Sequence, residues 1–246
     1  MDLEITETES PPQDAKVIIG VPDSGLVGLI SASFLIDQLE MKEIASFDSD
    51  LFPPVVVLHD GVPKSPMRAY AKDDLMVLIS ESAIKLTTMR KVMRQVLSWI
   101  QDIDGSISVG LTGAPAPNRM DIDTPKVYGV SVNMNGGETI DDLGVDRLQE
   151  AMLAGPYAMV LEYARRTKLP NLTLLAQSHL KYPDPGAAAE ILKVSSGFLG
   201  KELDVQPLME KADEIRLKMR DLMRNTQKVM KDSGKEREYE LPSMYV

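Results

Sequence analysis

The chain contains no cysteine among its 246 residues. Disulfide bonds, thiolate metal sites and cysteine nucleophiles are therefore excluded, and the composition is typical of a cytosolic protein. Aromatic residues are also scarce, at 5%, so the core must depend on aliphatic side chains and on methionine, which fills irregular gaps. No stretch approaches the ~20 apolar residues that a membrane-spanning helix requires.

Basic residues are fewer than acidic ones, and the formal net charge is −10. A chain of this charge is repelled by nucleic-acid phosphates, so we expect neither nucleic acid nor a membrane among its partners. Residues 1–14 carry five acids and no base, the opposite of the basic start of a secretion signal. We expect residues 1–14 to form a disordered acidic lead-in and the protein to be cytoplasmic.

Short apolar runs alternate with helical patterns through most of the chain. The run AKVIIGV (15–21) is typical of a strand that is buried on both faces. Residues 171–178 predict another strand, and Asp184 followed by Pro185 predicts the start of a helix. The alternation predicts an α/β core domain over residues 15–203, built as a three-layer αβα sandwich with a mostly parallel central sheet.

The last part of the chain has a different pattern. Residues 204–233 predict one C-terminal amphipathic helix, because apolar residues recur at alternating three- and four-residue spacing. Such a helix packs against its own domain or associates with a second copy. A third interpretation is that its methionines bind unfolded or unassembled proteins. We expect Gly234 to end the helix and residues 234–246 to form a flexible tail.

The segment VIIGVPDSGLVG (17–28) is the candidate for a small-ligand site. A strand leads through a glycine-containing turn to a helix N-terminus, where backbone N–H groups can hold an anion. The spacing matches neither the dinucleotide fingerprint nor the P-loop, and no lysine follows. The glycines also suit a tight turn with close helix packing. The candidate ligand-binding residues are Gly20, Pro22, Ser24, Gly25 and Gly28.

An enzyme would combine this turn with one of the two histidines, His59 or His179, which each follow an apolar run. Active sites of α/β folds gather at strand ends. However, the sequence contains no zinc-protease motif and no nucleophile-elbow motif. We therefore predict that the protein is not an enzyme and has no catalytic residue, metal site or cofactor. A small-ligand-binding protein or enzyme that uses the Gly20–Gly28 loop is the alternative function.

The chain ends in EYELPSMYV (238–246), which places two tyrosines and several apolar residues at a charged terminus. A mobile C-terminal peptide can be captured through its carboxylate while alternate side chains enter pockets. The last three residues have the form hydrophobic residue, tyrosine, any residue. This pattern resembles the tail motif by which proteasome activators and assembly factors dock between neighbouring α-subunits of the core particle. The resemblance makes Met244, Tyr245 and Val246 the predicted partner-binding residues.

Two longer segments carry a second resemblance. Residues 17–54 contain a G-x-P-x-x-G-x-V-G turn followed by a helix and a strand pattern. Residues 169–215 contain Pro183-Asp184-Pro185, an alanine-rich helix and a Leu-Gly-x-x-Leu-Asp connector. Both segments resemble the archaeal and eukaryotic proteasome assembly chaperone family.

This family resemblance implies a three-layer α/β domain that acts without ATP. It further implies an archaeal homo-oligomer whose tails dock on α-subunits of the proteasome core particle. The implied function is that of an assembly chaperone or activator-like adaptor.

Overall fold

Nine strands form one central sheet in the computed structural model, which describes residues 3–103, 107–134, 136–233 and 235. In chain order these strands are β1 (Glu4–Glu7), β2 (Lys16–Gly20), β3 (Lys42–Asp48), β6 (Met67–Lys72), β7 (Leu75–Ser80), β8 (Ile107–Pro115), β9 (Val127–Val132), β10 (Asp146–Arg147) and β11 (Asn171–Ser178). A separate hairpin pairs β4 (Val57–His59) with β5 (Val62–Lys64).

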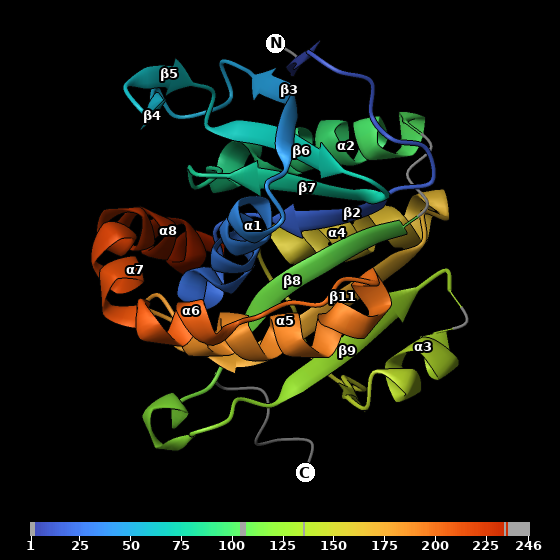
Figure 1. The fold of residues 1–246 in the computed structure, drawn as a ribbon, viewed down its shortest axis with the longest axis vertical. Helices are drawn as coiled ribbons and strands as arrows, with labels where there is room; N and C mark the ends of the chain where they lie inside the picture. Colours follow the sequence, from blue (N-terminus) through green and yellow to red (C-terminus); the bar gives the residue numbers. More distant parts are fainter. Residues whose placement is uncertain (1–2, 104–106, 135, 234, 236–246) are drawn as a thin grey trace.

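The helices cover both faces of this sheet (Figure 1). They are α1 (Val27–Gln38), α2 (Leu86–Asp102), α3 (Gly136–Asp142), α4 (Pro156–Thr167), α5 (Pro185–Leu199), α6 (Gln206–Glu210), α7 (Ala212–Lys218) and α8 (Arg220–Ser233), with short 3-10 turns η1 (Ser24–Leu26) and η2 (Arg119–Asp121). None of the helices in the described part of the chain is both long and apolar enough to cross a membrane.

The strand order is β1-β3-β6-β7-β2-β8-β11-β9-β10. The four central strands, β7, β2, β8 and β11, run parallel. At the margins, β1, β3 and β6 form an antiparallel group beside β7, and β9 runs antiparallel to β11. The predicted α/β class is therefore confirmed, with parallel pairing concentrated in the centre. One cause is the two-residue connection between β6 and β7, Asp73-Asp74, which is too short for anything except a hairpin.

Two apolar clusters lie on opposite faces of the sheet and give the predicted three layers. Ile18 faces the cluster under α1 and α5, whereas Val17 and Ile19 face the cluster under α2 and α4. In Figure 1, α1 and α5 lie in front of the sheet, with α2 and α4 behind it. Strand β2 is apolar at every one of these positions because both of its faces are covered.

The N-terminal segment differs from the prediction. Residues 1–14 were expected to be disordered, but β1 pairs with β3 at the sheet edge, with Ile5 opposite Phe47. Leu3 and Ile5 pack against the cluster under α2, and the indole N–H of Trp99 donates to Glu7 at 2.7 Å. The acidic composition conceals this strand, because every second side chain faces solvent and only the alternate ones meet the core.

The C-terminal segment also differs from the prediction. The single helix expected over residues 204–233 is divided into α6, α7 and α8 by breaks at Lys211 and Met219. These breaks allow the segment to follow the curved surface of its own domain, where Leu208, Met223 and Met230 are buried. Of the expected tail (residues 234–246), the structure describes only Lys235. The predicted partner-binding residues Met244, Tyr245 and Val246 lie outside the described residues.

Candidate functional site at the carboxyl ends of the parallel strands

The turn between β2 and α1 is packed against the sheet with no spare room. A Cβ atom on Gly20 would lie 2.2 Å from the Cβ of Ala32, and one on Gly28 would lie 2.2 Å from the carbonyl oxygen of Leu111. Gly25 has a φ of +61°, a conformation that glycine adopts without steric cost. Glycine at these three positions therefore lets α1 lie directly on the sheet.

Tyr157 of α4 is buried and holds the end of β2. Its hydroxyl donates to the carbonyl oxygen of Ile19 at 3.0 Å and accepts from the backbone N–H of Val21 at 3.2 Å. Complete burial raises the pKa of the Tyr157 phenol far above its usual value. The phenol therefore stays protonated and remains a hydrogen-bond donor to the backbone.

Asp23, inside the turn, forms a buried ion pair with a residue far along the chain. Its Oδ2 lies 2.9 Å from the Nζ of Lys235 and accepts a hydrogen bond from Thr112 at 2.9 Å. Both charged side chains are 2% exposed. Lys235 also donates to the carbonyl oxygen of Ala154 at 3.0 Å. The end of the C-terminal segment is thereby fixed to the turn.

Helix α8 covers the carboxyl ends of β2 and β7, which lie at the edge of the sheet where α/β folds usually bind ligands. Thr226, Val229 and Met230 of α8 face Pro22 and the residues that follow β7. The hollow left between them measures about 10 Å3, which is the space of one water molecule. In this conformation the turn has no room beside it for a nucleotide.

The five candidate ligand-binding residues, Gly20, Pro22, Ser24, Gly25 and Gly28, are all buried in this turn. Within the described part of the chain, the Ser24 and Ser178 hydroxyls and the Oδ1 atom of Asp23 have no hydrogen-bond partner. No described base therefore contacts Ser24 to activate it as a nucleophile. Among the residues that the structure describes, no group of three or more His, Asp or Glu side chains is placed to hold a metal ion.

The two histidines lie in different surroundings. His59 belongs to the β4–β5 hairpin, and its Nε2 lies 2.8 Å from Glu81 and 2.9 Å from Arg68. His179 lies beside the turn, because its carbonyl oxygen would be 3.1 Å from a Cβ on Gly25. The fold therefore brings His179, and not His59, to the candidate loop.

His179 sits in a loop that the start of α5 holds in place. The carboxylate of Asp184 accepts from the backbone N–H of His179 at 3.0 Å and from that of Ala187 at 3.0 Å. It also forms an ion pair with Arg119 at 2.8 Å. Asp184 is thus the N-cap, with Pro185 at the first helical turn, as predicted.

We expect His179 to make the folded state less stable in acid. Burial lowers the pKa of its imidazole, an effect that Asp184 opposes and that Arg119 and Arg216 reinforce. Because the unfolded chain then takes up the proton first, the contribution to stability is complete above pH ~6.5 and is lost as the pH falls below it. The free energy of unfolding in urea, compared between the wild type and His179→Gln above and below pH ~6.5, measures this loss. An identical loss in both proteins would contradict the assignment.

Sequence reasoning did not find the Asp23–Lys235 pair, although Asp23 lies in the quoted turn. The available signal was the position of Asp23 between two apolar segments. A carboxylate buried at such a position is costly unless a cation pairs with it. The partner itself carried no signal, because Lys235 lies among other charged residues.

Comparison with known proteins identifies the family. The model of the PAC2 family matches residues 17–223, and the chain belongs to this family. This membership confirms the resemblance to proteasome assembly chaperones that the turn and the Pro-Asp-Pro segment suggested.

Individual relatives match over nearly the whole chain. An uncharacterized protein of Methanocaldococcus jannaschii, MJ0106, is 27% identical over 222 residues, which are 89% of this chain and 90% of that protein. The structure of Pyrococcus furiosus PbaA, described as an archaeal homolog of proteasome-assembly chaperone, superposes with a TM-score of 0.83 at 26% identity, covering 92% of this chain and 98% of PbaA. PbaB of the same organism, described as an archaeal proteasome activator, shares the fold with a TM-score of 0.73 at 22% identity, over 90% and 98% of the two chains.

Proposed function

We propose that this protein is an ATP-independent adaptor, either an assembly chaperone or an activator, that docks its C-terminal tail into pockets of the proteasome core-particle α-ring. The observation that carries the proposal is the terminal sequence Met244-Tyr245-Val246 in a chain of the PAC2 family. The descriptions of PbaA and PbaB support a partner of this kind. A cytoplasmic location follows from the same function.

Each of the three terminal residues has a chemical role in this proposal. The Val246 carboxylate pairs with a cation or with backbone donors of the pocket. Tyr245 supplies rigid apolar area and a phenolic hydrogen bond at low entropic cost. Met244 fills an apolar notch, to which its flexible side chain can adapt. Pro242 restricts the backbone just before them.

The surroundings of the β2–α1 turn support an adaptor more than a protein that binds a small ligand at this turn. The crevice beside the turn is covered by α8. The buried pair of Asp23 and Lys235 fixes the start of the tail on the domain. Eleven residues follow Lys235, and an extended chain of that length spans at most about 40 Å.

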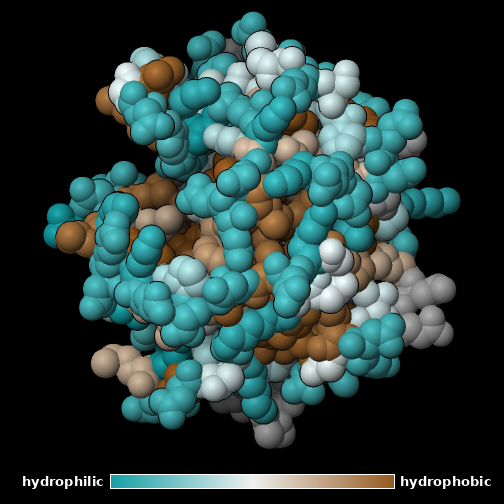
Figure 2. All heavy atoms as spheres, viewed as in Figure 1, coloured by the Kyte–Doolittle hydropathy of each residue, from teal (hydrophilic) through white to brown (hydrophobic). Residues whose placement is uncertain are grey.

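Several copies presented together would make a weak anchor effective. A three-residue anchor buries little area, so we expect a dissociation constant of about 1 μM or weaker for one tail. Linking several tails on one ring strengthens the overall binding by a factor of about 10²–10⁴ relative to a single tail. Val55 and Val56, just before the β4–β5 hairpin, and Leu58 and Val62 within it are exposed. Brown side chains protrude at the corner of Figure 2 where the hairpin lies. We assign this apolar surface to self-association.

Deleting Met244 to Val246 tests the docking proposal. We expect the truncated protein to stay folded, because Lys235 and its buried partner are retained, and to lose co-migration with purified core particles. Ser243→Ala is the matched control, since it alters the tail without altering the three terminal residues. Co-migration of the truncated protein at the wild-type level would refute tail docking.

A further inference from the structure

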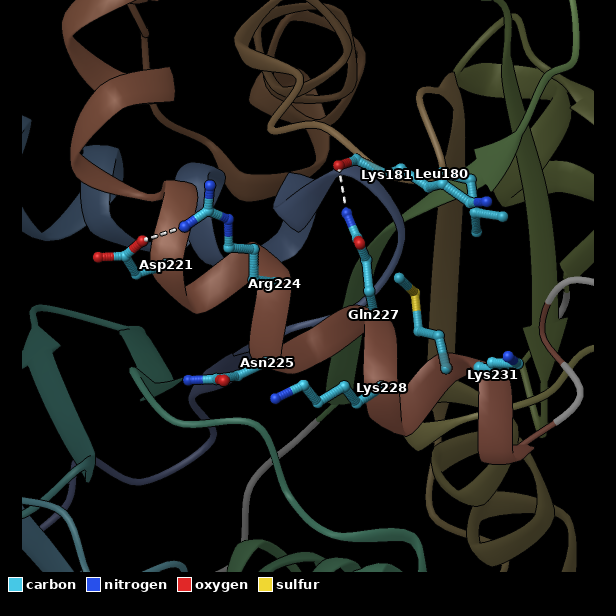
Figure 3. A pocket seen from close by; sticks show the side chains of 9 residues that line it. Leu180, Lys181, Asp221, Arg224, Asn225, Gln227, Lys228 and Lys231 are labelled. Carbon is cyan, nitrogen blue, oxygen red and sulfur yellow. Dashed lines mark hydrogen bonds and ion pairs between the residues drawn. The ribbon is translucent and has the colours of Figure 1, made fainter.

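A basic pocket lies between α8 and the loop that follows β11 (Figure 3). Its volume is about 650 Å3. Four cationic side chains, Lys181, Arg224, Lys228 and Lys231, line it, and Asp221 is the single acid in the lining. A local excess of positive charge is unusual on a chain whose net charge is −10. We use the name basic pocket for this site.

Three of these cations share one face of α8, because positions 224, 228 and 231 follow the i, i+4, i+7 spacing of a helix surface. Arg224 donates to Asp221 at 3.4 Å, a long contact. Among the described residues, neither the Lys228 nor the Lys231 side chain has a hydrogen-bond or ion-pair partner. Their ammonium groups are therefore available to an anionic partner.

A hydrogen bond joins the two walls of the pocket. The side-chain amide of Gln227 donates to the carbonyl oxygen of Lys181 at 2.6 Å, which joins α8 to the opposite wall, as the dashed line in Figure 3 shows. Met230 is buried beneath it. A preorganised wall lowers the entropy that a partner loses when it binds.

The position of the pocket relative to the tail suggests its partner. Lys231 is four residues before Lys235, where the tail leaves the domain. A docked tail of eleven residues keeps this face within about 40 Å of the surface that holds the terminal carboxylate. A surface that captures the tail is therefore within reach of the basic pocket.

We propose that the basic pocket is a second, electrostatic contact of the domain with the protein that receives the tail, and that it binds carboxylate side chains on that protein's surface. This inference rests on the proposed function. An acidic patch on a protein is favoured over nucleic acid because the cations are confined to one pocket. A phosphate backbone is a long polyanion that would also meet the acidic remainder of the chain. Exposed charge pairs of this kind act mainly on the rate of association and on its dependence on salt.

The test is the binding of full-length protein to purified core particles at several salt concentrations. We expect Lys228→Glu/Lys231→Glu to weaken binding about tenfold at low ionic strength. The difference should shrink at about 0.5 M salt, where exposed charges are screened over a few ångströms. Lys42→Glu/Lys126→Glu is the matched control, because it makes the same change of charge at exposed positions outside the pocket.

The outcomes separate this inference from the proposed function. If deletion of the last three residues abolishes binding while the Lys228/Lys231 variant binds as the wild type does at every salt concentration, only the basic pocket is refuted. If the wild type does not bind core particles at all, both proposals fail. Binding of the wild type to duplex DNA that the variant loses, with unchanged binding to core particles, would reassign the pocket to nucleic acid and overturn the inference.

Discussion

Replacing Lys235 with methionine is expected to lower the free energy of unfolding by about 3 kcal/mol, because it leaves a buried carboxylate without its counter-ion. Asp23 is 2% exposed and lies between β2 and η1, so it cannot turn toward water. Of its contacts, only the hydrogen bond from Thr112 would remain at Oδ2. Urea unfolding, followed by the fluorescence of the only tryptophan, Trp99, measures the change.

The double variant Asp23→Asn/Lys235→Met is the control for this prediction. A neutral amide at position 23 can keep its hydrogen bond to Thr112, and an apolar side chain at position 235 has no charge to desolvate. Replacing both members of a buried ion pair often leaves the free energy of unfolding unchanged. The double variant should therefore recover most of the stability that Lys235→Met loses. If Lys235→Met lowers the free energy of unfolding by less than about 0.5 kcal/mol, the ion pair contributes little to stability and the prediction is wrong.

The second large effect is expected at Gly28. Its missing Cβ would lie 2.1 Å from the hydroxyl of Tyr157 and 2.2 Å from the carbonyl oxygen of Leu111. Neither group can withdraw, because the hydroxyl holds the end of β2 and the carbonyl belongs to β8. Gly28→Ala must therefore displace α1 from the sheet, at a cost of about 3 kcal/mol. The same urea unfolding experiment measures it.

Gly197 provides the matched substitution. It is an exposed residue of α5, and a Cβ there would meet nothing within 4 Å. Gly197→Ala should raise stability by about 0.5 kcal/mol, because alanine loses less backbone entropy in a helix. Equal effects of the two substitutions would disprove the tight packing of α1 on the sheet.

Much of the fold was readable from local patterns. The buried strand at residues 16–20 and the start of α5 at Asp184 and Pro185 both depend on neighbouring residues. Periodicity and capping act within one or two turns of chain, so the sequence displays them directly. The family resemblance followed from the same short segments.

Features that depend on distant partners were not readable in this way. The acidic lead-in becomes strand β1 only because β3 and α2 offer an edge and an apolar surface. The three- and four-residue spacing after residue 204 predicted one helix over residues 204–233, but the segment breaks at Lys211 and Met219 where it packs on its own domain. Local spacing does not record the shape of the surface on which a segment packs.

The sequence alone therefore specified the α/β alternation, the tight βα turn and a terminal peptide with the form of a docking motif. The tertiary structure added the buried pair of Asp23 and Lys235, which are 212 positions apart, and the basic pocket that joins Lys181 to α8. Charged residues look alike in a sequence whether they face water or one another. Only the folded backbone brings two of them together and removes the water between them, and that burial gives the contact its energy.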